Sequence, residues 1–241
     1  MSHAFLLFSF SFAILPPMTM SDGERYYVMV FASQKNTINP NHTHSFAAFI
    51  KVTETKREKR IEHHTISWMS DSGKVKLLKL FPETGRNLGL HETIQWAMDR
   101  KQTISFWGPY EIHPELYHLA RQQIAGLEQT RKKYKTLDSF YPTRKTSNCI
   151  HAISDIAGNK RLRVASPFWG NTASYWVLRR YVKQGYVLDA NTEHCWLLEP
   201  LGLHIYPLRS RDFSPLRRRL LRNLCLRIST CGPKNCHCNL D

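Results

Sequence analysis

Cys149 stands where a polar segment passes into an apolar helix, a position that suits a nucleophilic thiol. The segment from Ser147 to Ile153 has the sequence SNCIHAI, and Gly158 marks the end of the helix that this pattern predicts. Ser147 or Asn148 can cap the helix, which puts Cys149 in its first turn. Backbone N–H groups and the positive end of the helix dipole favour a thiolate there, and one N–H can stabilise an oxyanion. The alternative is structural, because a cysteine is commonly a small buried residue.

A thiol that transfers acyl groups needs a base, which is usually a histidine that a third polar group orients. His151 lies two residues beyond Cys149, about 200° around a helix, so its side chain points elsewhere. His44 is a better candidate, because it enters a strand predicted at 45–53.

The third residue is expected on the partner strand, predicted at 61–69. His63 and His64 both lie there, and side chains alternate between the two faces of a strand, so only one of them can join His44. We favour His64. His63, Ser67 and His42 remain alternatives for this position.

The segment SNCIHAI resembles the Asn-Cys-x-His-aliphatic segment of the lecithin-retinol acyltransferase group, in the circularly permuted papain-like superfamily of thiol hydrolases and acyltransferases. The order of a histidine, a second polar residue and then a cysteine at a helix start is also that of the group. The resemblance implies a permuted papain-like fold, with Cys149 as nucleophile, His44 as general base and His64 as the orienting residue. It implies a thioester at Cys149 and an amide or ester substrate, such as a cell-wall peptide or a lipid.

The remaining elements predict an α+β domain over residues 24–210, with an antiparallel sheet packed against helices. Further strands are predicted at 25–33, 74–80 and 103–112. Helices are predicted from about 90 to 100, at 113–134, 149–157 and 171–185, and at 214–228, from hydrophobic spacing and from Pro and Gly at their ends.

The net charge of +15 favours an anionic partner and suggests a second function, binding without catalysis to nucleic acid or to an acidic membrane surface. No nucleic-acid motif accompanies the charge. A zinc site at His42 and His44 is a third possibility, but no acidic residue follows at a useful spacing. We therefore predict no metal and no cofactor.

The two ends of the chain differ from its middle. Residues 1–20 contain the apolar run Ala4 to Leu15, which has the length of a secretory signal and predicts an exported or cell-envelope protein. A start at Met18 or Met20 would instead predict a cytoplasmic one. Residues 211–241 form a basic extension with four of the six cysteines, and no transmembrane helix is predicted. The sequence does not indicate an oligomeric state.

Overall fold

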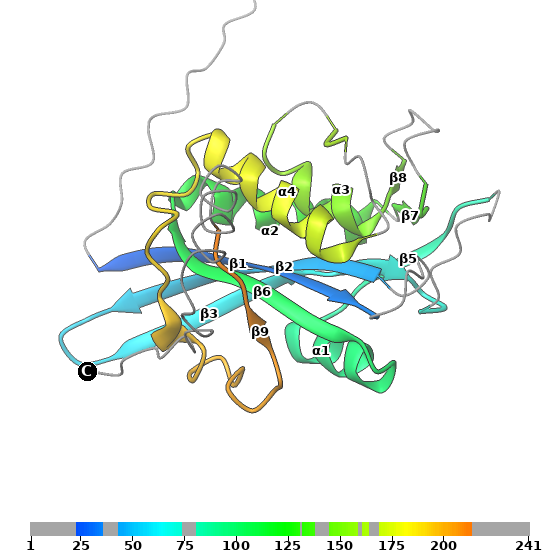
Figure 1. Cartoon of the computed structure of the whole chain (residues 1–241). Helices are drawn as coiled ribbons and strands as arrows, with labels where there is room; N and C mark the ends of the chain where they lie inside the picture. The colour runs from blue at the N-terminus through cyan, green and yellow to red at the C-terminus, as the bar shows by residue number, and fades with distance from the viewer. Residues whose placement is uncertain are drawn as a thin grey trace, which may run out of the picture.

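The computed structural model describes residues 23–35, 43–73, 81–130, 132–137, 145–158, 161–163 and 169–213. Its α+β class is as predicted (Figure 1). The predicted leader, the strand at 74–80, the helix at 214–228, the cysteine-rich tail and His42 lie outside the described residues.

The main sheet has five strands in the order β3-β2-β1-β6-β9. The first four are antiparallel to their neighbours, and the short β9 lies parallel to β6. The strands are β1 (Glu24–Gln34), β2 (Thr43–Glu54), β3 (Lys59–Ile66), β6 (Thr103–Ile112) and β9 (Arg209–Ser210). Strands β1, β2 and β6 are rich in aromatic and β-branched residues, which favour a sheet that is buried on both faces.

Two hydrophobic clusters cover the two faces of this sheet. Figure 1 shows α2, α3 and α4 along one face and α1 on the other. Alternation sorts the strand residues between them: Val28, Val30 and Phe49 belong to the cluster beside α2, α3 and α4. Met29 and Phe46 belong to the cluster beside α1 and the segment after Cys195. We call these the three-helix face and the α1 face.

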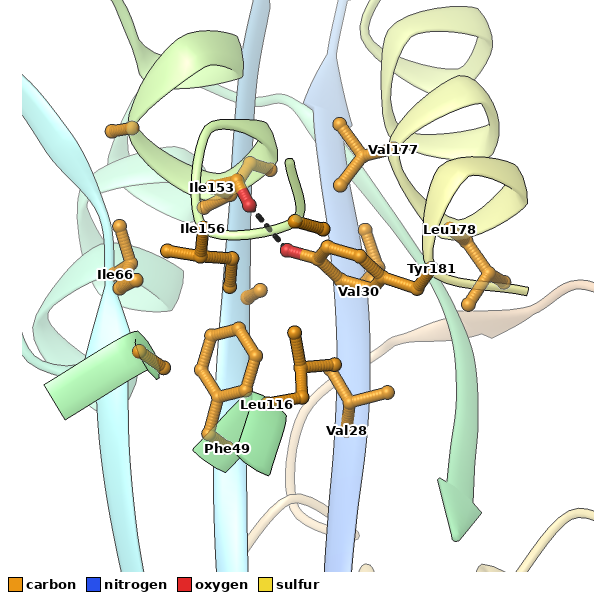
Figure 2. Packing of buried hydrophobic residues seen from close by; sticks show 14 of the residues in the cluster. Val28, Val30, Phe49, Ile66, Leu116, Ile153, Ile156, Val177, Leu178 and Tyr181 are labelled. Atoms are coloured by element: carbon orange, nitrogen blue, oxygen red, sulfur yellow. Dashed lines mark hydrogen bonds between the residues drawn. The ribbon is translucent and has the colours of Figure 1, made fainter. Parts of the chain in front are cut away.

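Figure 2 shows the cluster on the three-helix face, where aliphatic side chains of the sheet meet those of the helices. The hydroxyl of the fully buried Tyr181 donates a hydrogen bond to the carbonyl of Ile153, which ties α4 to the end of α3. The helices are α1 (Leu90–Asp99), α2 (Pro114–Gln129), α3 (Cys149–Ser154) and α4 (Gly170–Lys183). In the part of the chain that the structure describes, no helix is long and apolar enough to cross a bilayer.

A second, smaller sheet lies at one end of the molecule, in the order β4-β5-β7-β8. It comprises β4 (Trp68–Ser70), β5 (Glu83–Asn87), β7 (Lys133–Tyr134) and β8 (Thr146–Ser147). The prediction that the second helix continues to residue 134 is wrong, because Lys133 and Tyr134 pair with β5 and β8 as a strand. The predicted strand at 61–69 is also interrupted, since Ser67 lies between β3 and β4.

Candidate functional site

Cys149 begins α3, as the sequence predicts. Asn148 is the N-cap, and its side-chain oxygen accepts a hydrogen bond of 2.8 Å from the backbone N–H of His151. The amide nitrogen of Asn148 also donates to the carbonyl of Thr136, at 3.2 Å. Cys149 is half-buried and packs against the cluster on the three-helix face. The residue therefore lies in the first turn of a helix and is partly exposed.

His44 is almost completely buried, with 2% of its surface exposed. Its Nε2 lies 2.9 Å from the Ser67 Oγ, and the two atoms share a hydrogen bond. The ring stacks on Phe46 and meets the edge of Trp96 in α1, each with a centroid separation of 5.7 Å. Burial lowers the pKa of His44 to about 3. A histidine with this pKa is neutral at pH 7 and is a weak proton acceptor.

The contacts of His44 and of Cys149 lie on opposite faces of the main sheet. His44 contacts Phe46 and Trp96 on the α1 face, whereas Cys149 packs on the three-helix face. The sequence could not reveal this difference, because β2 is buried on both faces and its hydrophobic pattern does not distinguish them. The described contacts therefore do not bring the expected base to the expected nucleophile.

The prediction that His64 shares a face with His44 is also wrong. In the β2–β3 register His64 lies opposite Phe49, and its ring packs 5.5 Å from that of Tyr117 on the three-helix face. His63 lies opposite Ile50, on the α1 face. The side chain that hydrogen-bonds to His44 is that of Ser67, which was one of the alternatives.

A cavity of about 800 Å³ lies elsewhere, between α4 and the segment 161–163. We call it the basic groove. Most of the side chains that line it are cationic, and its size falls within the range of small-molecule sites. The lining residues are Arg161, Leu162, Arg163, Trp176, Arg179, Arg180, Lys183 and Gln184.

Two of the five cations in the groove are held by the protein itself. Arg161 donates a 2.7 Å hydrogen bond to the carbonyl of Thr146 and lies 3.8 Å from the carboxylate of Asp155. Arg180 donates to the carbonyl of Ala157. These contacts fix the inner wall of the groove.

The other three cations are not neutralised in this way. Among the described residues, no carboxylate lies within ion-pair distance of Arg163, Arg179 or Lys183. Arg163 and Lys183 are exposed, and the guanidinium of Arg179 lies 4.6 Å from the centre of the Trp176 ring. The groove therefore has an excess of positive charge directed toward solvent.

Helical spacing explains how the sequence builds this wall. Trp176, Arg179, Arg180 and Lys183 follow one another at i, i+3, i+4 and i+7, which places them along one side of α4. The opposite side of α4 is buried against the sheet. The spacing of these four residues can be read from the sequence. The apolar residues of the same helix, however, predicted only that it packs in the core, and gave no indication of a binding site.

A glycine allows the wall to close on the loop after α3. Gly158 has a φ of +105°, and a Cβ added there would lie 2.6 Å from Gln184 Nε2 and 2.9 Å from Arg180 Nη2. The backbone conformation therefore favours glycine, and a Cβ there would displace the ends of these two side chains.

The models of known protein families contain no match to this chain, and neither do the curated proteins or the solved structures. In the described ranges, no group of three or more histidine, cysteine, aspartate or glutamate residues could hold a metal ion. The fold and the groove thus define an α+β protein with a basic cavity.

Proposed function

We propose that the protein binds an anionic ligand in the basic groove. The observation that carries this proposal is the concentration of five cationic side chains around one cavity, three of them without a neighbouring carboxylate among the described residues. Guanidinium groups bind phosphate and carboxylate oxygens through paired N–H donors, and a concave wall strengthens such contacts by excluding water. The overall charge of +15 would draw anions toward the molecule.

Binding of inorganic tripolyphosphate to the full-length protein, measured by calorimetry, tests the proposal. The double variant Arg163→Ala/Lys183→Ala should bind tripolyphosphate at least about tenfold more weakly. This corresponds to a loss of about 1.4 kcal/mol in the free energy of binding. The matched control is Lys56→Ala/Arg57→Ala, which removes the same charge from the exposed β2–β3 loop. Equal losses in both variants would mean that only net charge matters, and absence of binding to the wild type would refute the proposal.

A second candidate function is acyl transfer at Cys149, as the resemblance implies. The observation that favours it is the position of Cys149, a half-buried residue at the capped start of α3. The thiolate would attack the carbonyl carbon of an amide or ester, and the leaving amine or alcohol would take up a proton. The resulting thioester would pass its acyl group to water or an amine, which restores the thiol. The separation of His44 from Cys149 weighs against this function relative to the first.

The pH dependence of alkylation by iodoacetamide tests the second candidate. Cys195, another half-buried cysteine, provides an internal comparison. Acyl transfer predicts that Cys149 reacts at a pH well below that needed for Cys195, and that His44→Ala removes this advantage. Identical pH profiles of alkylation for Cys149 and Cys195 would refute the catalytic proposal. Anion binding in the basic groove does not involve Cys149, so the variant Cys149→Ser should bind tripolyphosphate as tightly as the wild type.

A further inference from the structure

The basic groove is larger and less uniformly charged than an inorganic anion requires. Its volume of about 800 Å³ lies within the range of sites for drug-sized molecules. Leu162 and Trp176 contribute apolar surface beside the cations. The lining therefore suits a molecule with both an anionic group and an apolar or aromatic body.

The position of Arg179 favours phosphate as the anionic group. Its guanidinium lies over the Trp176 ring, 4.6 Å from the ring centre. An aromatic ring that packs against a guanidinium restricts its plane and leaves the N–H donors at its edge available, and this planar fork matches the oxygens of a phosphate. Arg163 and Lys183, both exposed, add two further charges around the same cavity.

The extent of the charged wall favours a small ligand over a polymer. Trp176 and Lys183 are seven residues apart on α4, which corresponds to about 10 Å along a helix. Grooves that follow single-stranded nucleic acid commonly accommodate about 4 to 16 nucleotides. A wall of two helical turns with one facing segment is short for that purpose and suits an open groove that holds one small molecule.

We infer that the ligand class of the basic groove is a nucleotide, an aromatic base joined to a chain of phosphates. This inference rests on the proposed function and specifies its ligand. The phosphates bind Arg163, Arg179 and Lys183, and the base packs on the apolar surface of Leu162 and Trp176. Base stacking on an aromatic side chain supplies affinity that an inorganic phosphate chain lacks.

Calorimetric titration of the full-length protein with ATP and with tripolyphosphate tests the inference. The two probes carry similar phosphate chains and differ in the nucleoside. The wild type should bind ATP about tenfold more tightly than tripolyphosphate. Trp176→Leu should reduce this ratio to about one, whereas Trp169→Leu should preserve it, because Trp169 is 53% exposed and does not line the groove.

A third variant separates the phosphate contacts from the base contacts. Arg179→Lys keeps the charge and loses the planar fork, so it should weaken both probes about tenfold and leave their ratio unchanged. If the variant Trp176→Leu still binds tripolyphosphate measurably, it is folded. Its ratio of ATP affinity to tripolyphosphate affinity can then be interpreted.

The outcomes distinguish this inference from the proposal on which it rests. Equal affinities of the wild type for ATP and tripolyphosphate would overturn the nucleotide assignment and leave the anion site intact. An ATP preference that persists in Trp176→Leu would overturn it as well. Failure of both probes to bind would refute the anion site itself.

Discussion

Replacing His44 with glutamine should make the stability of the protein less sensitive to acid. The substitution removes the titrating ring and keeps an amide that can bond Ser67, the present partner of His44 at 2.9 Å. Burial lowers the pKa of His44 from 6.5 to about 3 in the folded chain. The unfolded chain therefore takes up a proton on His44 between pH 6.5 and pH 3, and the folded chain does not. Stability from this residue is complete above pH 6.5 and is lost as the pH falls toward 3.

The size of the effect follows from the two pKa values. Their difference, 6.5 − 3, corresponds to about 5 kcal/mol at 1.36 kcal/mol per pH unit, which is the total loss at low pH. At pH 5 the unfolded state has bound the proton almost fully, and the loss is about 2 kcal/mol relative to pH 7. Two kilocalories are a large part of the 5–15 kcal/mol that stabilises a typical domain.

Equilibrium unfolding in urea at pH 7 and at pH 5 measures this loss. The wild type should lose about 2 kcal/mol more than His44→Gln on going from pH 7 to pH 5. Comparing the two losses cancels the contributions of the other histidines and any fixed cost of the substitution. If the free energy of unfolding depends on pH equally in the wild type and in His44→Gln, burial does not hold His44 neutral. The argument that its low pKa makes it a weak catalytic base would then be wrong.

Two other substitutions test the packing of the helices. Tyr181→Phe should lower the free energy of unfolding by about 1–3 kcal/mol, because the buried carbonyl of Ile153 loses its hydrogen bond. The control Tyr175→Phe should lower it by less than about 0.5 kcal/mol in the same urea experiment. Gly126→Ala in α2 should stabilise the protein by about 0.5–1 kcal/mol, since the added Cβ would meet nothing within 4 Å beyond the adjacent backbone of its own helix, and calorimetry should show a rise in Tm. An unchanged or lower Tm would show that the glycine has another role.

Local patterns were sufficient to predict most of the main elements. The aromatic and β-branched segments became β1, β2 and β6, and the helical spacing between residues 171 and 185 became α4. These segments carry strong signals because each buries several large side chains. The short β7 and β9 could not be found in this way, because two-residue strands depend on partners that are distant in the sequence.

The candidate sites depend more heavily on tertiary structure. The start of α3 at Cys149 was predictable from its cap, Asn148. The face on which His44 lies was not, since both faces of β2 are hydrophobic. The basic groove needs Arg161 and Arg163 beside α4, and nothing in the sequence fixes that proximity. The sites that combine distant segments are therefore the ones that sequence patterns miss.

The segment that follows α4, from Tyr186 to Arg211, lies along one edge of β6. The backbone N–H groups of Leu188, His194 and Arg211 donate to carbonyls of that strand, at 2.8 to 2.9 Å. The carbonyl of Tyr186 accepts from the N–H of His113, directly after the strand, at 2.9 Å. Without them, one edge of the ten-residue β6 would present unsatisfied backbone carbonyls, although its other edge would still pair with β1. Such an edge recruits strands from other molecules. A nick before Tyr186 that released this segment would also remove Leu197, Leu201 and Leu203 from the cluster on the α1 face. It would thus expose apolar surface beside a free strand edge, a combination that favours aggregation.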